Sequence, residues 1–207
     1  MSASLALRLL LASSLLISSL PAMAADIANA VRERLDSPAL LRGQFAQSKS
    51  ITGFKKPLLS NGDFLFWRDH GVIWHTKKPF DSMLTLTPRV LASSQNGNTT
   101  MRMDTRNEPT LATMNETLLA LLAGDIDNLK QRFHLDGELS GAHKWTLRLI
   151  PKDKGMATVI SQIELSGDRN VQRVVLQENN NDTSTILFSQ LSASPAASAD
   201  EAKLLRD

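Results

Sequence analysis

The chain has 207 residues, of which 42% are hydrophobic and 21% charged, with a formal net charge of +2 and no cysteine. This composition is typical of a globular protein of one domain and argues against a disordered or membrane-embedded chain. The near balance of charge argues against a nucleic-acid binder, whose affinity needs a basic face. The lack of cysteine excludes disulfides, thiolate nucleophiles and zinc–thiolate sites.

The first 24 residues have the pattern of a secretory signal peptide. Arg8 precedes an apolar run over residues 9–20, and Ala22 and Ala24 occupy the small-residue positions before a cleavage site. A membrane anchor is the alternative, but the run is shorter than the roughly 20 apolar residues that a spanning helix needs. We therefore expect cleavage of residues 1–24 and export. Because this segment holds one basic and no acidic side chain, its removal changes 23 basic and 21 acidic side chains to 22 and 21.

The mature chain is predicted to begin with an amphipathic helix and to continue as antiparallel strands. Ile27, Val31 and Leu35 recur at helical spacing, and Pro38 disfavours helix in the residue before it. After this helix the apolar pattern changes to a period of two, which is typical of strands. Strands are expected over residues 43–51, 61–69, 72–76 and 80–88, followed by a hairpin over 89–104 that turns at 95–98.

The middle of the chain is predicted to be helical, and a second set of strands follows it. Leucines at 118, 119, 121 and 122 form a short helical run that Gly124 ends, and a further turn of helix is expected over 125–131. The expected strands are 133–141, 144–152, 158–168, 170–180 and 183–191. Residues 193–207 are rich in alanine and serine and are predicted to be a flexible tail, although the final AKLLRD can form a docking turn.

These elements predict one mainly-β domain over residues 25–192. A single curved antiparallel sheet can bury its concave face only if the two helical segments cover it. The expected architecture is an incomplete, half-open barrel closed by the N-terminal helix and a short central helical lid. Such a fold has an apolar groove between sheet and helices, where small apolar ligands bind.

The densest stretch of polar and aromatic residues, 64–88, raises the question of catalysis. Its His70, His75 and Asp81 have spacings that fit strand alternation, and no histidine pairs with a carboxylate in the way common to metal sites. The sequence has no nucleophile elbow and no glycine-rich phosphate loop. We therefore expect no enzyme activity, no catalytic residue, no metal and no cofactor.

The same stretch resembles part of a known family, the LolA-type outer-membrane lipoprotein carriers. The matching features, in chain order, are Gly62-Asp63, an apolar strand, Arg68, a turn, Trp74, Pro79 and Asp81-Ser82. The preceding helix and the GQFAQ strand are similar to the start of that family. The resemblance covers residues 25–94 and continues only in the order of elements, as in the shorter branch of LolA-related proteins. Asp69 departs from the family pattern, which has proline at this position.

The resemblance implies a periplasmic carrier that shields acyl chains of a lipoprotein or lipid and ferries them from the inner to the outer membrane. Its expected partners are those acyl chains, an inner-membrane exporter and an outer-membrane acceptor, with no nucleic acid, and the carrier is expected to be a monomer. Arg68 matches the family arginine that latches the helical lid. The expected acyl-binding side chains are Phe45, Phe64, Phe66, Trp74, Leu84, Leu86, Leu118 and Leu122.

Three alternatives remain open. Arg68 shares the parity of Phe64 and Phe66, which points it inward in a regular strand, but it can also lie past the strand end in solvent. The protein can be an accessory protein of an envelope lipid exporter that binds no lipid itself. It can also be an enzyme on a lipid-linked substrate, for which His75 and Asp81 are the candidate groups in the groove.

Overall fold

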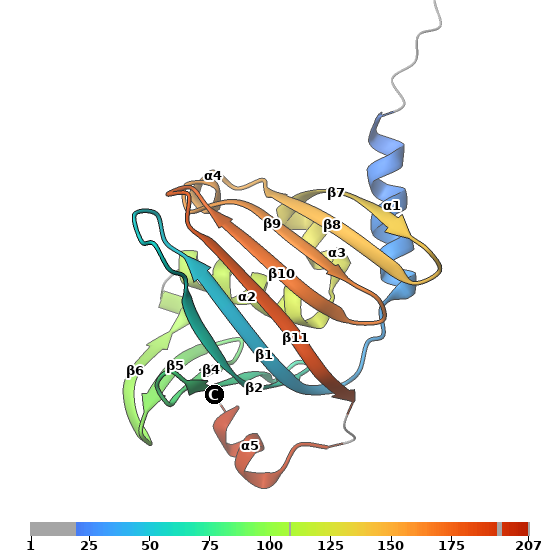
Figure 1. Ribbon diagram of the computed structural model, residues 1–207. Helices are drawn as coiled ribbons and strands as arrows, with labels where there is room; N and C mark the ends of the chain where they lie inside the picture. The colour runs from blue at the N-terminus through green and yellow to red at the C-terminus, as the bar shows by residue number, and fades with distance from the viewer. Residues whose placement is uncertain (1–19, 108, 194–195, 207) are drawn as a thin grey trace, which may run out of the picture.

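One antiparallel sheet of eleven strands forms the body of the protein, in a computed structural model that describes residues 20–107, 109–193 and 196–206 (Figure 1). The strand order is β6-β5-β4-β3-β2-β1-β11-β10-β9-β8-β7. The strands are β1 Leu40–Ser50, β2 Leu58–Trp67, β3 Gly71–Lys78, β4 Ser82–Leu86, β5 Val90–Gln95, β6 Asn98–Asp104, β7 Phe133–Ser140, β8 Lys144–Pro151, β9 Ile160–Gly167, β10 Val171–Glu178 and β11 Thr183–Ala193. The two edge strands do not pair with each other, so the sheet is curved but open, as predicted.

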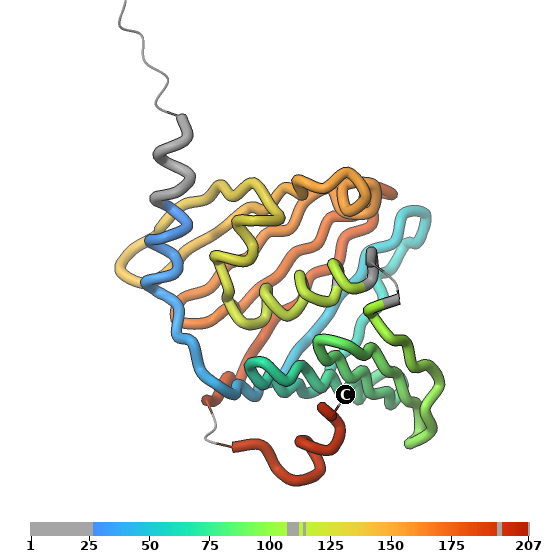
Figure 2. Tube along the Cα trace, turned by 180° about the vertical axis from the view of Figure 1, so that it is seen from behind, coloured from blue at the N-terminus to red at the C-terminus, as the bar shows by residue number. Residues whose placement is uncertain are grey.

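Helices from the N-terminal and central parts of the chain cover the inner face of this sheet (Figures 1 and 2). The helical elements are α1 Leu20–Arg34, the 3-10 turn η1 Thr105–Asn107, α2 Pro109–Ala123, α3 Ile126–Arg132, α4 Lys154–Ala157 and α5 Ala199–Leu204. Helix α1 packs along the edge strand β7, and α2 and α3 lie next to each other across the sheet. The predicted half-open barrel with a helical cover is therefore confirmed.

The main hydrophobic core lies between the helices and the inner face. On β2, Phe64 and Phe66 point into this core, whereas Leu65 points to the opposite face, as the period of a strand requires. From the helical side, Val31 of α1 and Leu129 of α3 are completely buried. Burial of a side chain of this size contributes about 1.5–3 kcal/mol, which is what holds α1 and α3 on the sheet.

A second, smaller cluster lies on the outer face and is covered by α5. It consists of Leu40, Leu65, Ile73 and Leu205, of which Leu205 follows α5. Ser198 and Glu201 form a capping box at the start of α5, and Arg42 binds the Glu201 carboxylate at 2.6 Å. Within the described part of the tail, α5 is thus a docked helix, which corrects the expectation of a flexible end. The alternative of a docking turn in AKLLRD is the closer description.

The predicted signal peptide lies mostly outside the described residues, and α1 begins at Leu20 and continues past Ala24, so cleavage there stays a prediction. Within the described ranges, none of the helices has the length and apolar character needed to cross a membrane. Helix α4, which the strand pattern did not predict, joins β8 to β9.

Candidate ligand-binding site

Four aromatic rings meet on the inner face of the sheet. Phe45 of β1 stacks on Trp74 of β3, with ring centroids 3.9 Å apart and an angle of 28° between the planes. Phe188 of β11 meets Phe64 edge-on at 5.1 Å, and it meets Trp74 edge-on at 6.0 Å. Phe45, Phe64 and Phe188 are buried, but Trp74 keeps part of its surface exposed. This aromatic cluster is therefore buried at three of its rings and accessible at the fourth, Trp74.

Two glycines make room for this aromatic cluster. Gly62 of β2 lies between Phe45 and the strand of Trp74, and a Cβ on it would be 3.0 Å from the Phe45 ring and 1.8 Å from the carbonyl oxygen of His75. A Cβ on Gly43 would be 2.7 Å from the Phe64 ring. The rings of Phe45 and Phe64 thus occupy the space that side chains at these positions would fill. The close packing of the cluster depends on both glycines.

Helix α2 forms the opposite wall of the site. Leu121 is buried against the core, and Leu119 and Leu122 pack against it while staying partly exposed. Asn115 is 2% exposed, and its Nδ2 donates a hydrogen bond of 2.6 Å to the carbonyl oxygen of Thr87. The Oδ1 of Asn115 is buried without a hydrogen-bond partner. The hydrogen bond from Asn115 therefore ties α2 to the sheet. The buried Oδ1 of the same side chain is an unsatisfied acceptor, which is costly in a closed site.

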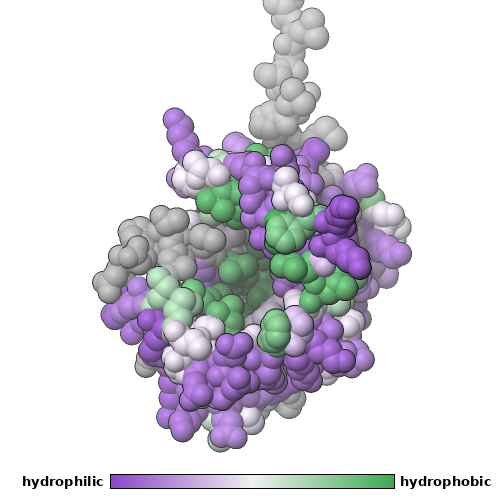
Figure 3. Space-filling view, turned by 60° about the vertical axis from the view of Figure 1, so that its left-hand side comes forward, coloured by the Kyte–Doolittle hydropathy of each residue, from purple (hydrophilic) through white to green (hydrophobic). Residues whose placement is uncertain are grey.

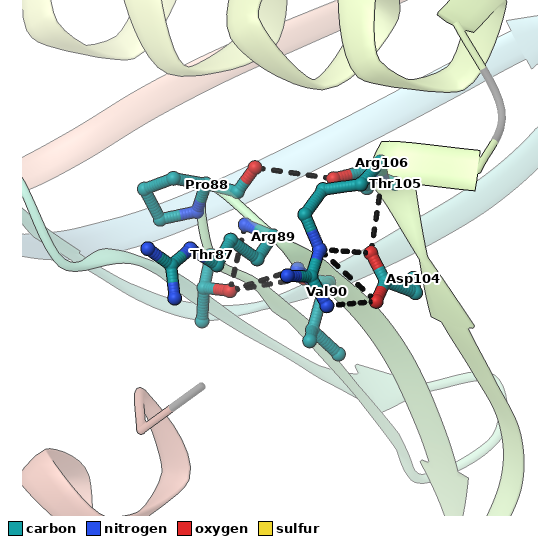
Figure 4. A network of polar contacts seen from close by, with 7 residues as sticks. All are labelled: Thr87, Pro88, Arg89, Val90, Asp104, Thr105 and Arg106. Carbon is teal, nitrogen blue, oxygen red and sulfur yellow. Dashed lines mark hydrogen bonds and ion pairs between the residues drawn. The ribbon is translucent and has the colours of Figure 1, made fainter.

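Thr87, whose carbonyl oxygen accepts this hydrogen bond, belongs to a network of polar contacts (Figure 4). The Thr87 hydroxyl accepts from the backbone nitrogen of Val90 at 3.0 Å. The Thr105 hydroxyl donates to the carbonyl of Pro88 at 3.1 Å, which ties this turn to η1. Next to it, hydrogen bonds from the Arg106 side chain and backbone lower the pKa of Asp104 to about 2. The turn between β4 and β5 is thus a fixed support for α2.

The space enclosed at the other end of α2 is small. A cavity of about 20 Å³ lies between Gly124, the α1–β1 connection at Pro38, and the rings of Phe64 and Phe188. This is room for about one water molecule, so an acyl chain can enter there only if the helical cover moves. Figure 3 shows a wider hollow on the side of the molecule that Figure 1 draws at the left, and hydrophobic side chains line its floor.

The structure brings most of the predicted acyl-binding residues together. Phe45, Phe64, Phe66 and Leu86 are members of the inner core, and Trp74 and Leu122 pack against it. Leu84 shares the inner parity of Leu86 and pairs with Trp74 across β3 and β4. Leu118 differs from the rest, since it is 45% exposed and lies outside this core. Phe188 is a further member of this core that was not predicted, although it alternates with Ile186 on β11 and that spacing could have revealed it.

Arg68 lies just past the end of β2. Its guanidinium donates a long hydrogen bond of 3.5 Å to the carbonyl of Pro38, and its backbone nitrogen donates to Ala39 at 2.9 Å. These contacts hold the α1–β1 connection rather than α2. Because Pro38 and the C-terminal end of α2 line the same small cavity, Arg68 supports one wall of the place where α2 ends. Its role as a latch stays a prediction.

The two candidate groups for catalysis are close together, but on the outer face. His75 Nε2 lies 2.8 Å from Asp81 Oδ2, and both side chains are partly exposed to solvent. His75 has the parity of Ile73, whose side chain belongs to the outer cluster. It lines an open groove of about 430 Å³ between α5 and the sheet, together with Arg42 and Glu201. The pair therefore does not face the aromatic cluster.

The fold and the apolar lining of its inner face define a half-open β-barrel with an apolar interior under a helical cover. This arrangement is suited to enclosing apolar ligands. The chain matches the family model described as outer membrane lipoprotein carrier protein LolA-like over residues 19–206, and it belongs to this family. The resemblance noted in the sequence is thereby confirmed. No curated protein matches the sequence closely enough to count as a relative.

Three solved structures are similar to this chain at low sequence identity. A DUF1329 family protein from Desulfovibrio piger is 13% identical, with a TM-score of 0.52 over 89% of this chain and 98% of that chain. A LolA superfamily protein from Nitrosomonas europaea is 12% identical, with a TM-score of 0.48 over 89% of this chain and 97% of that chain. A putative outer membrane lipoprotein-sorting protein domain from Vibrio parahaemolyticus is 9% identical, with a TM-score of 0.49 over 89% and 99%.

Proposed function

We propose that the protein is a periplasmic carrier that shields the acyl chains of a lipoprotein or lipid in its apolar interior and ferries them from the inner to the outer membrane. The observation that carries this proposal is the aromatic cluster of Phe45, Phe64, Trp74 and Phe188 beneath α2, with one ring still accessible. Membership of a family described as lipoprotein carriers supports it. An inner-membrane exporter and an outer-membrane acceptor are the partners that such a route requires.

The energy for holding an acyl chain comes from removing it from water. Each buried methylene contributes about 0.8 kcal/mol, so a single long chain has a substantial driving force to leave water and enter the apolar interior. The orphaned Oδ1 of Asn115 lowers the cost of separating α2 from the sheet, because an open α2 lets this oxygen reach water. In this proposal, Arg68 fixes the α1–β1 connection while α2 opens beside it.

The enzyme alternative has weaker support. His75 Nε2 and Asp81 Oδ2 are 2.8 Å apart, but their position on the outer face separates them from an acyl chain held against the aromatic cluster. The family description names carriers, which supports binding rather than catalysis. A lipid recovered from the protein in chemically unchanged form would agree with carriage, whereas a cleaved or modified lipid would indicate an enzyme.

The test combines mass spectrometry of lipids that co-purify with the exported protein and uptake of a fluorescent fatty acid by delipidated protein. Wild-type protein should carry intact lipid and take up the probe. Phe188→Ala, which opens the aromatic cluster, should weaken uptake, and Leu187→Ala on the outer side of the same strand is the matched control because Leu187 is 48% exposed. Delipidated wild-type protein that takes up no fatty acid would contradict the proposal and favour an accessory protein that binds no lipid.

A further inference from the structure

Exposed hydrophobic side chains and lysines lie close together in two segments of the chain, at the β1–β2 and β3–β4 connections and the strand ends next to them. Among the described residues, the four most exposed large hydrophobic side chains are Phe80 at 72%, Phe54 at 68%, Leu59 at 66% and Leu58 at 56%. Exposed lysines stand directly beside them in the sequence, in the runs FKKPLL and KKPF. We call the following eight residues the basic tip: Phe54, Lys55, Lys56, Leu58, Leu59, Lys77, Lys78 and Phe80.

The strand register places both parts of the basic tip at the same end of the sheet. The first residue of β2, Leu58, pairs with Lys49 near the end of β1. Three residues further along β2, Asn61 pairs with Lys78, the last residue of β3. The β1–β2 and β3–β4 connections therefore leave the sheet in the same direction. Figure 1 draws the β1–β2 connection at the left, the side that Figure 3 brings forward and on which the hydrophobic hollow opens.

The base of the β1–β2 connection is anchored, so its apolar residues project from a fixed support. The backbone nitrogen of Thr52 donates to the buried carboxylate of Asp182 at 2.9 Å, and the Thr52 hydroxyl donates to the carbonyl of Asn180 at 3.0 Å. The nitrogen of Phe54 donates to Ile51 at 3.0 Å. The side chain of Phe54 itself stays in solvent, so packing within the fold does not account for it.

The charges of the basic tip are only partly used within the protein. Lys77 forms an ion pair with Asp63, and the neighbouring carboxylate of Asp81 is paired with His75. For the other three lysines, no ion pair occurs within the part of the chain that the structure describes; these are Lys55, Lys56 and Lys78. The basic tip thus offers cations next to exposed apolar side chains.

We propose that the basic tip docks the protein on the surface of a membrane that contains anionic phospholipid. Lysines bind the headgroup phosphates of such a surface, while adjacent phenylalanine and leucine side chains enter the boundary of the acyl region. A protein partner fits the pattern less well, because the cores of protein interfaces are depleted in lysine. Docking in this direction turns the hollow of the inner face toward the membrane. The inference goes beyond carriage of acyl chains and holds for any ligand of the inner face.

The test is co-sedimentation with phospholipid vesicles, using protein expressed with its own N-terminal segment and purified after export. Vesicles of phosphatidylcholine are compared with vesicles in which about one quarter of the lipid is phosphatidylglycerol. The wild type should bind the anionic vesicles more tightly, and this preference should shrink as salt is raised. Since one lysine near an anionic surface changes binding about fivefold, replacing the four lysines of the basic tip by glutamine should weaken it at least fiftyfold, after allowance for screening.

Matched variants separate the basic tip from general charge and hydrophobicity. The charge control replaces four exposed cations elsewhere by glutamine, at Lys144, Arg169, Lys203 and Arg206. The apolar test is Phe54→Ser with Phe80→Ser, and its control is Leu139→Ser with Leu187→Ser. The tip variants should lose vesicle binding while keeping the melting temperature and fatty-acid uptake in solution, and the controls should bind like the wild type. Equal binding of tip and control variants, or wild-type protein that does not prefer anionic vesicles, would overturn the proposal.

Discussion

Replacement of Asn115 by alanine should loosen α2 without loosening the sheet. The substitution removes the 2.6 Å hydrogen bond to Thr87 and leaves that carbonyl, in a residue 3% exposed, without this donor. A lost hydrogen bond and a buried acceptor together cost about 1–3 kcal/mol. The orphaned Oδ1 disappears in the same substitution, which returns part of this cost. The net cost is therefore about 1–2 kcal/mol, or a factor of about 5–30 in the opening equilibrium of α2.

Native-state hydrogen exchange measures this opening segment by segment. Amides of α2 in Asn115→Ala should exchange about 5–30 times faster than in the wild type, while amides of β1 and β2 stay within about twofold. Asn29→Ala, at an exposed position of α1, is the matched control and should leave both rates unchanged. Unchanged exchange in α2 would refute the reasoning, and so would an equal acceleration in α2 and in the central strands, since it would mean that Asn115 stabilises the whole fold.

Three further predictions concern Gly62 and the carboxylates of Glu201 and Asp104. Gly62→Ala should lower the free energy of unfolding by about 3 kcal/mol in denaturant titration, because its Cβ would overlap the adjacent strand, and a cost near zero would contradict the packing described. Hydrogen bonding to Arg42 holds the pKa of Glu201 below 4.5, so the docking of α5 is stabilised above that pH and weakens as the pH falls through the lowered pKa. Proteolysis of the tail should accelerate with acid in the wild type but not in Glu201→Gln. NMR titration should find the pKa of Asp104 at about 2, and Arg106→Gln should raise it toward 3.8.

The sheet was predictable because its signal is local. Alternation along Phe64, Leu65 and Phe66 is visible in the sequence, and it sends the two rings inward and the leucine outward as the structure does. The same holds for α1, whose Val31 faces the core at the helical spacing of the pattern. Elements whose side chains alternate or recur along one segment therefore need no knowledge of the rest of the fold.

The parts that escaped prediction depend on distant contacts. Helix α5 is held by Arg42, which is 159 residues earlier in the chain, so composition alone suggested a flexible tail. In α2, leucines occur around much of the helix, and periodicity could not show that Leu118 is exposed whereas Leu121 is buried. The acceptor of the Arg68 guanidinium, Pro38, lies in a connection whose path follows from the packing of α1.

The most direct test of the proposed carrier is to map where a bound acyl chain lies. A fatty acid with a photoreactive diazirine on its chain is loaded onto the purified protein and crosslinked, and the labelled residues are identified by mass spectrometry. If the chain is held in the apolar interior, labels should fall on inner-face residues, above all Trp74 and Phe188 and the facing leucines of α2. Labels confined to the outer groove, at Ile73, Met83 and Leu204, would contradict this placement of the chain.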